Sequence, residues 1–73
     1  MSIMIYSKPG CVQCTATARA MDARDISFEM VDVTVDANAF AAVEALGYRQ
    51  LPVVVADDQH WSGFRPDRIA ALA

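Results

Sequence analysis

Strand and helix patterns alternate along this chain, and a pair of cysteines stands at the first change from strand to helix. Residues 3–6 (Ile-Met-Ile-Tyr) are rich in strand formers and are ended by Ser7-Lys8-Pro9-Gly10, which predicts a buried strand. Cys11-Val12-Gln13-Cys14 follows directly, and residues 12–24 contain neither Gly nor Pro, which favours a helix. This order predicts a β-α unit with both thiols at its turn.

A second β-α unit, a hairpin and a short last helix are expected in the rest of the chain. Asp36 is a suitable N-cap, Gly47 suits the left-handed position after a helix, and Asp57-Asp58 marks a tight turn. The apolar positions expected on the helices are Val12, Ala16, Ala20 and Met21 in the first and Phe40, Val43 and Leu46 in the second. The predicted elements are a strand at 26–33, a helix between Asp36 and Gly47, strands at 51–56 and 59–61, a loop at 62–65 and a helix beginning at Pro66 or Asp67 and ending at Leu72.

The order β-α-β-α-β-β-α predicts an α/β fold. Strands separated by helices are expected to pair in parallel and the closing hairpin to pair antiparallel, giving one mixed four-stranded sheet flanked by three helices. The 73 residues suffice for one domain, residues 1–73. With 55% hydrophobic and 21% charged residues, the composition is that of a globular protein and not of a disordered one.

The charge distribution argues against nucleic acid as a partner. The net charge is −3, and residues 25–44 carry five acidic residues and no basic one, so no cluster of Lys and Arg can follow a phosphate backbone. The cysteines lie in the more basic first third, with Lys8, Arg19 and Arg24. A thiolate formed there meets a mildly favourable field.

The chain is expected to be cytoplasmic. Its first residues lack the basic start, long apolar stretch and cleavage site of a secretory signal, and no run is long enough to span a bilayer, so no membrane association is expected. In that reducing compartment two cysteines at this spacing form a catalytic or metal-binding pair more often than a structural disulfide.

The position of the cysteines favours thiol chemistry. At a helix N-terminus the first backbone amides lack partners and the helix dipole leaves partial positive charge, and both stabilise a thiolate. A free thiol, with pKa near 8.5, is only a few per cent ionised at pH 7, and lowering the pKa to about 7 makes it half ionised. Cys11 is therefore the expected nucleophile, since it lies outside the helix and Gly10 beside it leaves the approach open.

Cys14, one helical turn further on, is the expected resolving thiol. Cys11 attacks a substrate disulfide, and Cys14 then attacks the Cys11 sulfur, so that reduced substrate leaves and a Cys11–Cys14 disulfide remains. An external reductase must restore the dithiol. No bound cofactor is needed for this chemistry.

Two other interpretations of the cysteine pair are open. A metal site of four ligands is poorly supplied, because the chain offers these two thiols and His60 besides carboxylates. A structural disulfide would close a loop too short to remove much entropy from the unfolded chain.

The strings Cys11-Val12-Gln13-Cys14, Leu51-Pro52-Val53 and Trp61-Ser62-Gly63-Phe64-Arg65-Pro66 together resemble the NrdH-redoxins over essentially the whole chain. The resemblance implies a thioredoxin/glutaredoxin fold. It also implies a redoxin that is reduced by thioredoxin reductase and that delivers electrons to class Ib ribonucleotide reductase. We expect such a carrier to act as a monomer.

The resemblance also implies roles around the thiols. Pro52 would be cis and would hold the Leu51 backbone toward the incoming disulfide, whereas sequence alone allows an ordinary proline at a strand start. Trp61 and Phe64 would form an exposed apolar patch, although a core position for Trp61 is an equal alternative, and Ser62 and Arg65 would hold the loop by hydrogen bonds. The other residues expected at the partner-binding surface are Lys8, Val12, Gln13 and Gly63.

Glutaredoxins that use glutathione provide the main rival. They follow a Gly-Gly pair with an acidic or amide residue that meets the amino group of glutathione, where this chain has Ser62-Gly63-Phe64-Arg65. An apolar ring and a cation in place of that partner predict poor glutathione binding. A metal or iron-sulfur module is the second rival.

Asp25 stands where the family pattern has a Gly that ends the first helix. Asp can adopt the left-handed conformation of such a Gly, at some cost.

Overall fold

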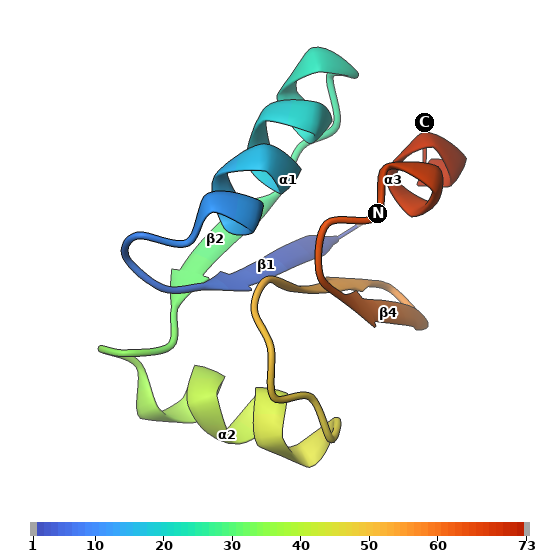
Figure 1. Cartoon of the computed structure of the whole chain (residues 1–73). Helices are drawn as coiled ribbons and strands as arrows, with labels where there is room; N and C mark the ends of the chain where they lie inside the picture. Colours follow the sequence, from blue (N-terminus) through green and yellow to red (C-terminus); the bar gives the residue numbers. More distant parts are fainter. Residues whose placement is uncertain (1, 73) are drawn as a thin grey trace.

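The computed structural model describes residues 2–72, and they form a mixed sheet with helices on both faces (Figure 1). The elements in chain order are β1 (Ile3–Ser7), α1 (Val12–Ala23), β2 (Glu29–Asp32), α2 (Ala37–Ala45), β3 (Val53–Ala56), β4 (Gln59–Ser62) and α3 (Pro66–Leu72). The sheet has four strands in the order β2-β1-β3-β4. The predicted α/β fold with three helices is confirmed.

The helices form two layers around the sheet. Helices α1 and α3 cover one face and α2 covers the other (Figure 1). Alternation along the strands divides the apolar side chains between the two faces, as the strand period of two requires. No helix within residues 2–72 is long and apolar enough to cross a membrane.

The larger core lies between the sheet and the pair α1 and α3. Ile5, Val54 and Trp61 stand side by side on neighbouring strands, and Met21 and Ile69 pack on them from the two helices. Ile5, Met21, Val54 and Ile69 are fully buried, and burying an aliphatic side chain of this size stabilises a fold by roughly 1.5–3 kcal/mol. This core holds α1 against the sheet through Met21, near the end of the helix, while the cysteines stand at the helix start.

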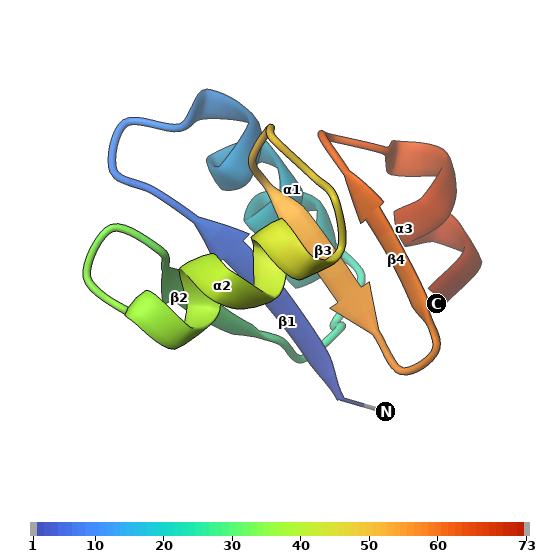
Figure 2. The ribbon, with the colours of Figure 1, turned by 90° about the horizontal axis from the view of Figure 1, so that it is seen from below.

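The pairing of strand β3 differs from the one expected. It lies antiparallel to β1, with Ile5 opposite Val54, although strands separated by helices were expected to pair in parallel. Helix α2 is short and crosses the sheet obliquely instead of running back along the strands (Figure 2). The chain therefore enters β3 at the sheet end where β1 finishes and the cysteines begin.

Three other expectations about the elements are wrong in detail. Of the apolar positions expected on α2, only Val43 is buried. Ala39 and Val43 face the sheet, so Phe40 and Leu46 lie at the side of the helix. Val12 is 82% exposed, because the first residue of α1 lies at the edge of the core. The strand expected at 26–33 begins only at Glu29, since the chain leaving α1 first bonds back to the helix and Ile26 packs on the core outside the sheet.

The predicted helix ends are confirmed. The Asp36 carboxylate accepts a hydrogen bond from the Ala39 N–H at 3.0 Å, which caps α2. Gly47, after α2, has φ 84°, and Asp25, after α1, has φ 56°. The expected left-handed Asp25 thus takes the place of a glycine at this turn.

Candidate active site around Cys11 and Cys14

Cys11 and Cys14 are joined as a disulfide in the turn between β1 and α1, with their Cα atoms 5.2 Å apart. Cys11 is the N-cap of α1, and its sulfur accepts the backbone N–H of Cys14 at 3.2 Å. Cys11 is half-buried, whereas Cys14 is only 3% exposed. A substrate can therefore reach the first sulfur and not the second, the geometry that an attacking and a resolving thiol require.

The N-cap geometry predicts an acidic Cys11 thiol. In the reduced protein the Cys14 N–H and the positive end of the helix dipole both favour the thiolate, so we expect the pKa of Cys11 to lie below that of a free thiol. The pH dependence of alkylation by iodoacetamide measures this pKa, and Cys11→Ser supplies the background rate. A Cys11 that titrates like a thiol in an unstructured peptide would contradict the prediction.

The peptide bond between Leu51 and Pro52 is cis, as the resemblance implied. It lies in the segment that connects α2 to β3. The Leu51 carbonyl oxygen is 3.8 Å from the Cys11 sulfur, and the Leu51 N–H makes no hydrogen bond within residues 2–72. Main-chain groups of Leu51 thus lie next to the more accessible sulfur.

The loop after β4 is tied to both of these segments. The Ser62 hydroxyl donates to the Gln50 carbonyl oxygen at 3.0 Å, and the Gly63 N–H donates to the Pro52 carbonyl oxygen at 2.8 Å. The Gln13 side-chain oxygen accepts the Phe64 N–H at 3.3 Å. Gly63 has φ 85°, a conformation that other residues adopt at a cost, which explains a glycine here. Three segments distant in sequence are thereby joined around Cys11.

Trp61 is not part of an exposed patch. It is 3% exposed in the main core, and the Arg68 guanidinium lies 5.7 Å from its ring. Trp61 lies on the strand face that α1 and α3 cover, so the sheet alternation buries it. Phe64, beyond the end of β4, is 37% exposed, as expected. The apolar side chains that this site presents to solvent are therefore Val12 and Phe64.

The basic residues of the predicted site are not in contact with the sulfurs. Lys8 is exposed and takes part in no ion pair described within residues 2–72. Arg65 hydrogen-bonds the Asp67 side chain through two nitrogens, at 3.3 and 3.2 Å, and so contacts α3 and not the loop backbone. The Arg65 hydrogen bonds lower the pKa of Asp67 below its usual value.

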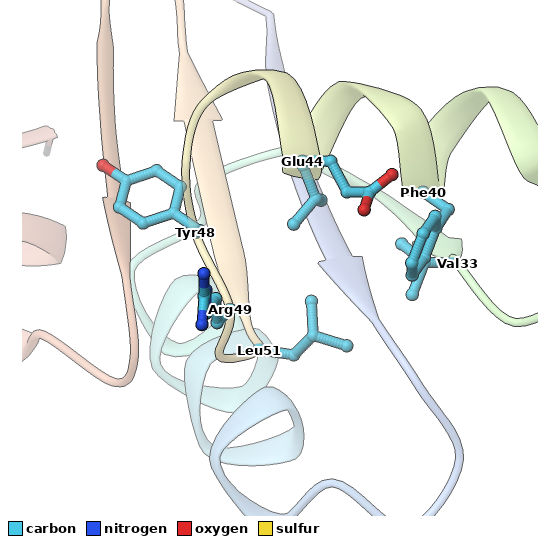
Figure 3. A pocket seen from close by; sticks show the side chains of 7 residues that line it. Val33, Phe40, Glu44, Tyr48, Arg49 and Leu51 are labelled. Atoms are coloured by element: carbon cyan, nitrogen blue, oxygen red, sulfur yellow. The ribbon is translucent and has the colours of Figure 1, made fainter.

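A hollow of about 280 Å³ beside Leu51 was not anticipated from the sequence. Its walls come from the end of β2, from α2 and from the segment before β3, as Figure 3 shows. They are formed by Val33, Phe40, Val43, Glu44, Tyr48, Arg49 and Leu51. No sequence motif unites these residues, because only the crossing of α2 over the sheet brings them together.

No group of three or more His, Cys, Asp or Glu side chains gathers in metal-binding geometry among the described residues. His60 lies on β4 and contacts Tyr48 instead, with the Tyr48 hydroxyl 2.7 Å from His60 Nδ1.

Comparison with known proteins identifies the family. The glutaredoxin family model matches residues 3–61. The glutaredoxin-like protein NrdH of Salmonella typhimurium is 56% identical over 72 residues, covering 99% of this chain and 89% of that protein. The chain belongs to the NrdH group of the glutaredoxin family. It is accordingly a thiol-disulfide oxidoreductase with its cysteine pair at Cys11 and Cys14.

Solved structures agree with membership of the NrdH group. The NrdH-redoxin of Escherichia coli, which is described as glutaredoxin-like with a thioredoxin-like activity profile, superposes with a TM-score of 0.96. The two sequences are 53% identical, and the match covers 100% of this chain and 96% of that one. A buckwheat glutaredoxin in complex with glutathione shares the fold alone, with a TM-score of 0.73, 18% identity, and coverage of 88% of this chain and 62% of that one.

Proposed function

We propose that this NrdH-type protein carries electrons from NADPH-linked thioredoxin reductase to the large subunit of a class Ib ribonucleotide reductase. The Cys11 thiolate attacks a sulfur of the acceptor disulfide, so that a mixed disulfide forms and one acceptor sulfur leaves as a thiolate. Cys14, as thiolate, then attacks the Cys11 sulfur and releases the second acceptor sulfur. Two electrons have passed, and thioredoxin reductase reduces the resulting Cys11–Cys14 disulfide.

The loop after β4 is the structural feature that favours these partners. It presents an exposed Phe64, and its Gly63 and Phe64 backbone N–H groups are already bonded to Pro52 and Gln13. Arg65 follows where glutathione would need an acidic or amide partner for its amino group. Like charge at that point disfavours glutathione, while an apolar surface with Val12 and Phe64 suits a protein partner.

The Leu51 backbone supports a protein disulfide as substrate. Its N–H, which makes no hydrogen bond within residues 2–72, lies one residue before the cis proline, and its carbonyl oxygen lies beside the Cys11 sulfur. An extended segment of a substrate can pair with these groups by main-chain hydrogen bonds, as in strand addition. Such pairing recognises a backbone and is therefore available to any extended disulfide-bearing segment.

Two coupled assays test the choice of reductant. With NADPH and thioredoxin reductase the protein should turn over a protein disulfide rapidly, and with NADPH, glutathione and glutathione reductase it should turn over at least about ten-fold more slowly, because the amino group of glutathione lacks a counter-charge. A glutathione-using glutaredoxin serves as the control for the second system. Rapid turnover with glutathione and none with thioredoxin reductase would contradict the proposal.

We further propose that the redox centre is the cysteine pair itself, with no bound cofactor, and that the carrier acts as a monomer in the cytoplasm. Metal analysis and the visible absorbance of protein purified without oxygen test the first statement. A stoichiometric metal that is lost in Cys14→Ser would instead support a metal or iron-sulfur module.

A further inference from the structure

The segment that presents Leu51 to Cys11 has little backbone support of its own. Residues 49–51 lie outside helix and strand, and their N–H groups make no hydrogen bond to any residue that the structure describes. The position of this segment therefore depends on contacts at its two ends. Toward Pro52 it is tied to the loop after β4 through the Gln50 carbonyl and the Ser62 hydroxyl.

The other end is held by the Tyr48 N–H, which donates to the Val43 carbonyl oxygen at 3.3 Å, and by a side-chain contact between Tyr48 and His60. The Tyr48 hydroxyl lies 2.7 Å from His60 Nδ1 and donates to the His60 carbonyl oxygen at 3.3 Å. The two rings meet edge to face, with centroids 5.5 Å apart. His60 pairs with Val55 in the β3–β4 ladder, so Tyr48 is bound to the sheet.

Tyr48 also forms a wall of the hollow beside Leu51. Figure 3 shows its ring extending from the segment toward the neighbouring strand, with its hydroxyl directed away from Leu51. A ring fixed at its far end keeps both this wall and the start of the segment in place. Without the hydroxyl contacts, the tie between Ser62 and Gln50 would be the only side-chain bond to this segment within residues 2–72.

We propose that Tyr48 and His60 are positioning residues, which hold the Leu51 backbone in the geometry that pairs with an extended protein disulfide. This inference rests on the pairing role proposed above for Leu51. The pair touches neither sulfur, so it acts on recognition of extended substrates and not on the reactivity of Cys11. A small disulfide that needs no backbone pairing should be indifferent to it.

Stopped-flow measurements on chemically reduced protein, with no reductase present, test the inference. The substrates are insulin, as a protein disulfide, and dithiobis(nitrobenzoate), as a small disulfide. Tyr48→Phe should lower the second-order rate constant with insulin about three- to ten-fold, the range expected for the loss of a hydrogen bond. The rate constant with dithiobis(nitrobenzoate) should stay within about two-fold of the wild-type value. Thermal unfolding of each variant records its stability.

Variants of the pair distinguish positioning from independent effects. His60→Ala should reduce the insulin rate no more than Tyr48→Phe, because the Tyr48 bond to the backbone carbonyl remains, and the double variant should match Tyr48→Phe. His60→Asn, which keeps a polar group near the Nδ1 position, should recover most of the rate. Tyr6→Phe is the matched control, since the Tyr6 hydroxyl has no hydrogen bond within residues 2–72.

Three outcomes would each overturn the inference while leaving the proposed function intact. They are equal losses of rate with both substrates, additive losses in the double variant, and an insulin rate that does not change in Tyr48→Phe. A wild-type protein that does not reduce insulin at all would overturn the pairing role of Leu51, and with it this inference. The inference is supported if Tyr48→Phe lowers the rate with insulin alone and if His60→Asn recovers most of the insulin rate that His60→Ala loses.

Discussion

Cys14→Ser should accumulate as a mixed disulfide with its protein substrate, whereas Cys11→Ser should form none. Cys11 is half-buried at the start of α1 and accepts the Cys14 N–H, while the Cys14 side chain is 3% exposed. Only the first sulfur can therefore attack an incoming disulfide, and only the second can resolve the product. Multiple turnover should fall at least about a hundred-fold in either variant, because each loses one of two successive exchange steps.

The two variants are compared by non-reducing electrophoresis and by the mass of the trapped species after reaction with an oxidised substrate. The double variant Cys11→Ser/Cys14→Ser gives the background. Because serine keeps the size of the side chain, the fold should be unchanged, which circular dichroism checks. Equal trapping by both single variants would contradict the assigned roles.

Trp61→Ala should destabilise the protein by about 3–5 kcal/mol, the usual cost of removing a large buried aromatic side chain. Trp61 is 3% exposed, lies beside Val54 in the β3–β4 ladder and carries the Arg68 guanidinium over its ring. A domain of this size has a total stability of only about 5–15 kcal/mol, so a large part of it should be lost. Urea unfolding followed by circular dichroism measures the change, since the substitution removes the single tryptophan.

Phe64→Ala is the control for this prediction, because Phe64 lies in the same stretch of chain but is 37% exposed. Its loss of stability should be about 1 kcal/mol. If Trp61→Ala were as mild as Phe64→Ala, the tryptophan would not be the core residue that the structure shows. The two substitutions thus separate the buried position on β4 from the exposed position in the loop that follows it.

The site depends on three connections that meet at one end of the sheet. The turn after β1 supplies both sulfurs, the segment before β3 supplies the Leu51 backbone, and the loop after β4 joins them through Ser62, Gly63 and Phe64. Strand β3 must run antiparallel to β1 for this to happen, because a parallel strand would begin at the far end of the sheet. The oblique path of α2 therefore brings the Leu51 backbone beside Cys11.

The local features of this protein were determined by its sequence alone. The position of Cys11 and Cys14 at a strand-to-helix turn, the cap at Asp36 and the left-handed turns at Asp25 and Gly47 depend on residues within a few positions of one another. Capping, turn preference and hydrophobic period act over such short spans and can be interpreted without knowing the rest of the fold. The cis proline followed from the family resemblance.

The tertiary structure alone decided which faces were covered and which distant segments met. The burial of Trp61, the exposure of Phe40 and the hollow beside Leu51 follow from how α2 and α3 pack on the sheet, and the contact between Tyr48 and His60 follows from the hairpin register. An apolar or aromatic residue has the same preference for burial wherever it stands in the sequence. Whether that preference is met depends on what the fold brings against it, and this is a property of the packed chain and not of any local pattern.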